Sequence, residues 1–170
     1  QAVVRLIDKN DVVLDIGAGD LRLAVRLARI AKKVYALERQ VDLLRLGRTL
    51  QKENWPANII LLPGDARRLV FPTDVTTGVL LMRHCRHFRL YAEKLKAVGA
   101  ERLITNARWG LDVESIALAG GRGRYTDLPL GWFACLCGQT GFKPGPVEQL
   151  NEEYLNKIWE VHNCPACENS

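Results

Sequence analysis

Acidic side chains and glycines at the ends of predicted strands are the residues best suited to bind a small ligand. The run Asp15-Ile16-Gly17-Ala18-Gly19 closes a short apolar segment, and glycines there let the chain turn sharply beside a ligand. Glu38 closes the second such segment, where a carboxylate can accept from both hydroxyls of a ribose. Asp65 follows the third, where a carboxylate can accept from an adenine amino group. This spacing predicts one nucleoside site; the alternative is a structural turn with solvated acids.

Candidate catalytic residues follow the fourth apolar segment, in the run Arg83-His84-Cys85-Arg86-His87. A histidine titrates near neutral pH, so His84 or His87 could take a proton from a substrate. The alternative is that both are loop histidines, because the sequence identifies no partner carboxylate. Arg83 is a candidate for substrate contact, and Cys85 is expected to be a small apolar residue beside the core.

Further basic residues are candidates for binding an anion. Arg122 and Arg124 lie in the glycine-rich loop 120–124, and their guanidinium groups could bind a phosphate or carboxylate of a substrate. The alternative is a solvated surface loop. A stripe of basic residues at helical spacing is expected to be the solvent face of its helix. This stripe consists of Arg22, Arg26, Arg29 and Lys33.

Four of the five cysteines form two close pairs that could bind one metal ion, Cys135-Leu136-Cys137 and Cys164-Pro165-Ala166-Cys167. Structural zinc prefers four thiolates in a tetrahedron, which leaves no open position for catalysis. We therefore predict a structural zinc site that fastens the tail 162–170 to the rest of the chain. The alternatives are reduced thiols, a disulfide, a redox pair, or a site in which His162 replaces a cysteine. The odd count fits a reducing, cytoplasmic compartment better than a secreted disulfide framework.

An alternation of strands and helices must position these candidates. Short apolar runs predict strands and amphipathic segments predict helices. The expected strands are 12–16, 33–37, 58–62, 75–82 and 102–106, and the expected helices are 21–30, 41–52 and 88–98. This alternation implies an α/β fold, with a mostly parallel sheet and helices on both faces.

The pattern changes beyond about residue 109. Segments 131–137 and 138–146 could form an antiparallel hairpin at the edge of the sheet. Segment 147–161 has helical periodicity, carried by Val147, Leu150, Tyr154, Leu155, Ile158 and Trp159. We expect one domain over residues 1–161, followed by the tail 162–170.

Composition and charge limit the classes of function. The chain has 170 residues, of which 48% are apolar and 25% charged, as in an ordinary globular domain rather than a disordered chain. No apolar run approaches the ~20 residues that cross a bilayer, so we expect no membrane partner. Residues 1–124 carry a net charge of +9 and residues 125–170 a net charge of −4. This asymmetry suggests a nucleic acid, an acidic protein or a small anion as partner; the alternative is charge that serves solubility.

The chain resembles the class I S-adenosylmethionine-dependent methyltransferases in the runs VVLDIGAGDLRLAVRLA, VYALER and GDARRL, over roughly residues 8–110. The resemblance implies a Rossmann-like sheet with an antiparallel terminal strand or hairpin, and S-adenosylmethionine as cofactor. It implies cofactor contacts from Asp15, Gly17, Ala18, Gly19, Glu38, Asp65 and Ala66. By position, the glycine turn would line the methionine and ribose, Glu38 would hold the ribose hydroxyls, and Asp65 with Ala66 would meet the adenine.

Two neighbouring residues separate this chain from common patterns. Leu21 stands where many members of the family have a small residue, which predicts crowding where the first helix begins. Arg22 stands where a nicotinamide or flavin fingerprint needs Gly or Ala for close helix packing, which argues against those cofactors. The sequence also lacks a phosphate-binding loop of the Gly-x-x-x-x-Gly-Lys-Ser/Thr type, which argues against a nucleotide triphosphatase.

The resemblance implies an enzyme that transfers a methyl group to an unidentified acceptor. No Asn/Asp-Pro-Pro-Tyr-like motif follows the fourth strand, which argues against adenine or cytosine amino groups as the acceptor. The alternative is a catalytically inactive module of the same fold, whose basic body and zinc-stabilised tail contact a nucleic acid or a protein. A third interpretation is a fragment of a larger enzyme, since the chain opens at Gln1 and few residues precede the first strand.

Overall fold

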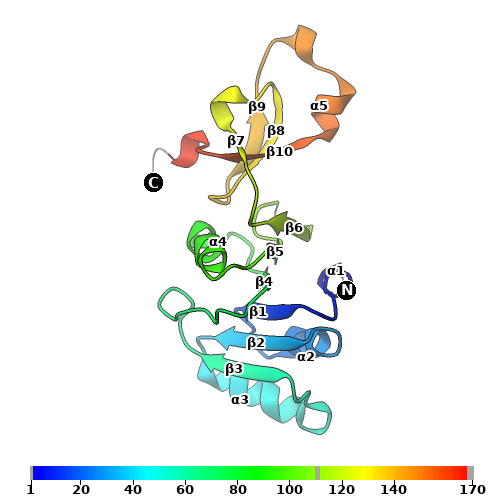
Figure 1. The fold of residues 1–170 in the computed structure, drawn as a ribbon, viewed down its shortest axis with the longest axis vertical. Coiled ribbons are helices and arrows are strands. Elements are labelled where there is room, and N and C mark those ends of the chain that lie inside the picture. Colours follow the sequence, from blue (N-terminus) through cyan, green and yellow to red (C-terminus); the bar gives the residue numbers. More distant parts are fainter. Residues whose placement is uncertain (1, 110–111, 168–170) are drawn as a thin grey trace.

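A computed structural model describes residues 2–109 and 112–167, which fold into two β-sheets (Figure 1). The first sheet contains β1 (Val12–Ile16), β2 (Lys33–Glu38), β3 (Ile59–Pro63), β4 (Thr77–Leu80), β5 (Arg102–Thr105) and β6 (Glu114–Ala117). The second contains β7 (Gly123–Arg124), β8 (Gly131–Cys135), β9 (Thr140–Lys143) and β10 (Ile158–His162). The α-helices are α1 (Ala2–Arg5), α2 (Arg22–Ala28), α3 (Val41–Leu50), α4 (Phe88–Ala97) and α5 (Glu152–Asn156). Short 3-10 turns cover Lys52–Asn54, Tyr125–Asp127, Val147–Gln149 and Pro165–Cys167.

The first sheet is the mostly parallel sheet that the alternation of strands and helices predicts. Its order is β3-β2-β1-β4-β5-β6, and its neighbouring strands pair in parallel except for the antiparallel pair β5 and β6. Every residue of β1 and β4 is buried, as expected of central strands that are covered on both faces. The direction of strand addition reverses between β1 and β4, and open α/β sheets bind ligands beside such a switch point.

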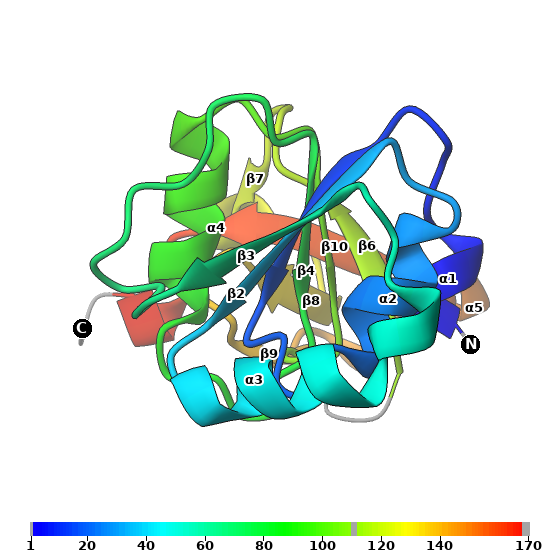
Figure 2. The same ribbon diagram turned by 90° about the horizontal axis from the view of Figure 1, so that it is seen from below.

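Helices cover both faces of this sheet, as the sequence predicts (Figure 2). Successive strand residues point to opposite faces, so Val13 and Leu14 of β1 belong to two different hydrophobic clusters. The Val13 cluster contains residues of α1, α2 and α3, whereas the Leu14 cluster contains the apolar face of α4. Among the described residues, no helix is both long enough and apolar enough to span a membrane.

The predicted hairpin forms, but it belongs to the second sheet rather than to the edge of the first. β8 and β9 pair in antiparallel fashion, and β10 adds to β8 in parallel, with β7 on its other side. Phe133, Cys135 and Val161 form a small core on one face of this sheet. The C-terminal third of the chain therefore has a core of its own.

The prediction of one helix over residues 147–161 is wrong. The segment contains a 3-10 turn, then α5, and then β10, which starts at Ile158. Asn151 begins α5, and its side chain accepts a hydrogen bond from the Tyr154 amide at 2.9 Å. Val147 is 79% exposed, so the helical stripe does not cover a core, whereas Val161 is buried against β8. Pairing with a distant strand therefore outweighs the local periodicity.

A buried arginine joins the two sheets. The side chain of Arg108, in the loop after β5, is fully buried and forms ion pairs with Glu114 at 2.5 Å and with Glu160 of β10 at 2.6 Å. Burial opposes its charge, but the two carboxylates more than offset this, so the pKa of Arg108 is raised. β10 extends to His162, across the predicted boundary at residue 161. The division into a domain and a tail stays a prediction, and residues 168–170 of that tail lie outside the described residues.

Candidate cofactor cavity and cysteine cluster

A cavity of about 330 Å³ opens at the carboxyl ends of the central strands of the first sheet. This volume lies within the range of about 300–1,000 Å³ that is usual for small-molecule sites. Its lining includes Gly17, Glu38, Asp65, Ala66, Met82 and His87. The structure thus brings the three loops of the predicted nucleoside site together, whereas the part that each residue plays in binding stays a prediction.

The glycine turn after β1 keeps the backbone close to the cavity. Gly17 has φ 80° and Gly19 has φ 55°, a region that L side chains rarely adopt. The amides of Gly17 and Ala18 donate to the Leu37 carbonyl oxygen at 2.8 and 3.0 Å, which ties the turn to the end of β2. A Cβ on Gly17 would lie 3.4 Å from the Met82 sulfur, so only a small residue leaves this wall of the cavity unchanged.

Glu38 is held in place by backbone donors from both sides. Its Oε2 accepts from the Gly19 amide at 3.0 Å, and its Oε1 accepts from the Gln40 amide at 2.8 Å. The residue is 8% exposed and lines the cavity. Each carboxylate oxygen has two lone pairs, so Glu38 retains acceptor positions for two ribose hydroxyls.

Asp15 is a buried acid that lacks a full set of partners. Its Oδ2 atom is buried and has no hydrogen-bond partner among the described residues. Burial, and then the nearby charge of Glu38, raise the pKa of Asp15 to about 7. An unpaired buried carboxylate oxygen is costly unless it meets a donor or a positive charge. Asp15 is not itself among the residues that line the cavity, but it lies two residues before Gly17, which is. A cationic ligand beside the glycine turn would offset the cost of this buried charge, so the residues present fit S-adenosylmethionine.

The loop after β3 is fixed by two basic side chains that the sequence analysis did not identify. Arg67 donates to both carboxylate oxygens of Asp65, and these bonds hold the pKa of Asp65 well below its usual range. Lys94 of α4 donates to the carbonyl oxygens of Ala66 and Leu69 at 2.5 and 2.6 Å. Burial lowers the pKa of Lys94. No local pattern reveals the role of Lys94, because it depends on how α4 packs against the loop, whereas Arg67 is only two residues from Asp65.

The position of Leu21 in the sequence predicts that its side chain crowds the cavity, but in the structure it does not. It has φ 66° and is fully buried in the core beneath the first sheet, and it is not part of the cavity lining. Space for it comes from Gly47 of α3. A Cβ on Gly47 would lie 2.4 Å from the Asp20 carbonyl oxygen and 2.9 Å from Leu21 Cγ. The bulky residue therefore packs against α3 instead of the ligand.

The two candidate histidines lie on different sides of one loop. His87 lines the cofactor cavity, with its ring 6.2 Å from the Tyr91 ring, whereas His84 lines a separate hollow. His84 has φ 55°, an uncommon conformation for a residue with a side chain. Arg83 is exposed beside it. Cys85 is half-buried, and burial raises the pKa of its thiol.

The glycine-rich loop does not bring its arginines to the cofactor cavity. Arg122 donates to the Ala117 carbonyl oxygen, and its Nε lies 3.6 Å from Glu160, so it is occupied within the fold. Its side chain is only 9% exposed. Arg124 is exposed on β7, in the second sheet.

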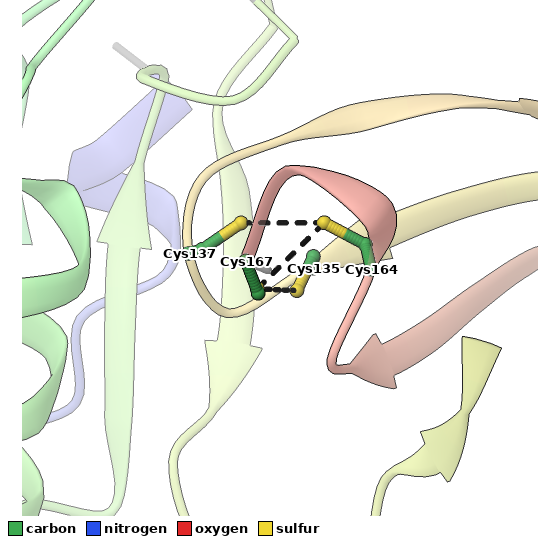
Figure 3. Close-up of side chains that lie close together, drawn as sticks. All are labelled: Cys135, Cys137, Cys164 and Cys167. Atoms are coloured by element: carbon green, nitrogen blue, oxygen red, sulfur yellow. Dashed lines mark hydrogen bonds between the residues drawn. The ribbon is translucent and has the colours of Figure 1, made fainter. Parts of the chain in front are cut away.

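The four cysteines of the two sequence pairs form a compact cluster at the end of the second sheet (Figure 3). Their sulfur atoms all lie within 4.8 Å of one another. The distances are 3.6 Å for Cys135 to Cys167, 3.5 Å for Cys137 to Cys164, and 3.8 Å for Cys164 to Cys167. A disulfide has sulfur atoms about 2.0 Å apart, so none is formed here. Four sulfurs around zinc, each about 2.3 Å from the metal, would lie about 3.8 Å apart.

The surroundings shift the pKa values of the clustered thiols in different directions. Burial raises the pKa of Cys137 and Cys164. Burial acts in the same direction on Cys135, but backbone and thiol hydrogen bonds more than offset it, so its pKa is lowered. His162 is not part of the cluster, and its Nδ1 lies 3.0 Å from the Arg122 carbonyl oxygen. The arrangement therefore fits four sulfur ligands rather than three with a histidine.

Comparison with known proteins identifies the fold. No family model matches the sequence. Over 82 residues the chain is 38% identical to an uncharacterized protein of Methanocaldococcus jannaschii, a match that covers 47% of this chain and 32% of that protein. The chain thus spans about a third of the length of this relative.

Solved structures of methyltransferases and related enzymes are similar to about three fifths of this chain. Precorrin 8w decarboxylase of Methanobacterium thermoautotrophicum has 25% identity and a TM-score of 0.51, over 61% of this chain and 57% of that one. TYW2 of Methanocaldococcus jannaschii, in complex with S-adenosylmethionine, has 21% identity and a TM-score of 0.51, over 60% and 47%. A phosphoethanolamine N-methyltransferase of Haemonchus contortus, solved with S-adenosylhomocysteine, has 17% identity and a TM-score of 0.55, over 63% and 24%. The chain has a class I methyltransferase-like fold, as the resemblance predicts.

Proposed function

We propose that this chain binds S-adenosylmethionine in the cavity beside β1 and transfers its methyl group to an acceptor. The observation that carries the proposal is the unpaired, buried Oδ2 of Asp15 next to a glycine turn and an oriented Glu38. Together they offer a counter-charge and acceptor positions to a cationic nucleoside. The similar solved structures that contain S-adenosylmethionine or S-adenosylhomocysteine support this choice of cofactor.

The residues of this chain would bind and orient the cofactor rather than react with it. Glu38 would accept from the ribose hydroxyls and Asp15 would face positive charge, while Asp65 and Ala66 would meet the adenine. When bound, S-adenosylmethionine supplies an electrophilic methyl group, whose bond to sulfur breaks as a bond to the acceptor forms. His87 lines the cavity and is the better placed candidate to hold a proton that leaves the acceptor.

Calorimetric titration with S-adenosylhomocysteine tests the binding site. We expect the wild-type protein to bind at micromolar concentration and Glu38→Ala to lose at least about tenfold in affinity, because charge-assisted hydrogen bonds to the ribose disappear. Glu93→Ala, which removes an exposed carboxylate from α4, is the matched control and should bind like the wild type. Equal affinity of Glu38→Ala and the wild type would contradict the assignment. Binding without methyl transfer to any acceptor would favour an inactive module.

We also propose that the cysteine cluster binds one structural zinc ion. The sulfur distances of 3.5 to 3.8 Å support this, because they match the edges of a tetrahedron around zinc. Cys135 and Cys137 flank the end of β8, and Cys164 and Cys167 follow β10. The ion would therefore fasten the end of the chain to the second sheet and contribute directly to its folding.

A further inference from the structure

A second hollow, of about 360 Å³, lies between the loop after β4 and the second sheet. The loop after β4 and the start of α4 contribute His84, Arg86 and Phe88 to its lining. The hairpin of the second sheet contributes Gln139 and Thr140. The same loop supplies Met82 and His87 to the cofactor cavity. The two spaces are thus separated by one stretch of about six residues, at the carboxyl end of β4.

The two walls of this hollow pack closely against each other at the start of α4. Gly138, in the turn between β8 and β9, has φ 100°, and a Cβ there would lie 3.2 Å from Phe88 Cβ. The second sheet is therefore packed directly against the loop that borders the cofactor cavity. An acceptor bound in the hollow would contact both sheets.

The loop after β4 carries positive charge that nearby acids do not balance, with Arg86 in the lining of the hollow and Arg83 in the same loop, outside that lining. Arg83 and Arg86 are exposed, and neither forms an ion pair within the described part of the chain. The neighbouring Arg89 is paired with Glu93 at 2.8 Å. The buried network deeper between the sheets contains two arginines and two carboxylates, and so has no net charge. An anionic group is the natural partner of the two free guanidinium groups.

Exposed aromatic rings continue from the hollow along the hairpin. Thr140 and Phe142 are two residues apart on β9, so they share a face, with Phe142 about 7 Å further along. Phe142 is 38% exposed and its cross-strand partner Trp132 is 40% exposed, with ring centroids 5.2 Å apart. Trp109 contacts the other side of Trp132, with centroids 6.4 Å apart. Exposed rings on a sheet can stack on unpaired nucleic-acid bases.

Acidic residues bound this surface on the side away from the arginines. α5 lies against β8 at Gly131, where a Cβ would be 3.1 Å from the Tyr154 carbonyl oxygen. α5 begins with Glu152 and Glu153, both exposed. A polyanion on the aromatic rings is therefore repelled from the α5 side, and its backbone is directed toward Arg83 and Arg86.

We propose that the hollow and the adjoining rings bind a single-stranded nucleic acid, with phosphates on Arg83 and Arg86 and bases on Trp132 and Phe142. The role of this strand as methyl acceptor rests on the proposed function. The binding of the strand does not. In the transfer, the methyl group would replace a proton on a base or ribose atom, that proton would leave to a base or to solvent, and S-adenosylhomocysteine would be released. The lack of an Asn/Asp-Pro-Pro-Tyr-like motif argues against the amino groups of adenine and cytosine as the methylated atoms.

Fluorescence anisotropy with a labelled single-stranded RNA of about 12 nucleotides tests the proposal. This length is suitable because proteins that bind single strands contact about 4–16 nucleotides per binding module. Removing both arginines, in Arg83→Ala with Arg86→Ala, should weaken binding at least about tenfold and reduce the salt dependence. Trp132→Ala with Phe142→Ala should weaken it by a similar factor and leave the salt dependence unchanged. The matched control is Arg26→Ala with Arg29→Ala, which removes the same charge from exposed positions at α2 and should change affinity less than about threefold.

The outcomes separate this proposal from the proposed function. Equal weakening in the control, equal affinity for a duplex, or no binding of RNA by the zinc-loaded protein would each overturn it. The same variants are titrated with S-adenosylhomocysteine, which all of them should bind like the wild type. RNA binding without cofactor binding would defeat the proposed function but not this site, and the reverse result would defeat this site alone. Far-ultraviolet circular dichroism verifies that each variant is folded.

Discussion

Asp15 is a residue whose ionisation depends strongly on its surroundings. It is fully buried at the end of β1, its Oδ2 lacks a partner, and Glu38 adds a second negative charge nearby. Such a group is costly in the empty protein and useful in a complex with a cation. The same residue therefore connects the stability of the protein, its pH dependence and its choice of ligand.

The affinity for S-adenosylmethionine should rise with pH. The pKa of Asp15 is about 7 in the unliganded protein, and a cation favours the ionised form, so binding releases a proton. Between about pH 5.5 and 7.5 the ionised fraction grows about twentyfold, so we expect affinity to increase at least about tenfold. Calorimetry at several pH values measures this, and Asp15→Asn should bind weakly with a flat profile.

Stability should change with pH in the opposite direction. The pKa of Asp15 in the folded protein lies above its ordinary value of 3.8, so the unliganded protein loses stability as pH rises from about 4 to 7. Denaturant titrations of the free energy of unfolding should show this decline in the wild type and a smaller one in Asp15→Asn. A flat affinity profile in the wild type would contradict the coupling of binding to Asp15, and the same rise in Asp15→Asn would show that another group titrates.

At the scale of elements, the first sheet follows from local sequence, whereas of the second sheet only the hairpin of β8 and β9 does. Runs such as residues 12–16 are apolar except for Asp15 because both faces of a central strand are covered, and this signal is contained in the run itself. β10 is different, because Ile158 pairs with Trp132, far away in the sequence. Its apolar residues also fit a helix, and only the partner strand decides between the two structures.

The candidate sites divide in the same way. The glycine turn and Glu38 could be identified because strand ends and spacing are local features. Lys94, which holds the loop after β3, could not, since its contacts depend on how α4 packs. The prediction that Leu21 crowds the cavity is wrong, because Gly47, on another helix, leaves the space that its side chain occupies.

The second sheet should depend on the metal for its stability. In the full chain, Cys164→Ser with Cys167→Ser should contain far less than one equivalent of zinc, because two of four ligands are lost. Hydrogen exchange in β8, β9 and β10 should become faster, while β1 and β4 stay protected. Cys85→Ser is the control, since Cys85 lies outside the cluster. A full equivalent of zinc in the double variant, or none in the wild type, would contradict the zinc site.

At the scale of the whole molecule, one loop connects the two proposed activities. Residues 82–88 border the cofactor cavity on one side and the hollow beneath the second sheet on the other. The buried Arg108 connects the two sheets through its ion pairs with Glu114 and with Glu160 of β10. An acceptor held by the second sheet would therefore be presented to a cofactor held by the first.

A crystal structure of the protein grown with S-adenosylhomocysteine is the decisive test of the cofactor site. We expect the ligand in the cavity beside β1, with both ribose hydroxyls within hydrogen-bond distance, about 3 Å, of the Glu38 carboxylate. The amino group of the ligand should lie on the side of Asp15 Oδ2. A ligand bound elsewhere, or a cavity that stays empty at saturating ligand, would contradict the assignment of this site.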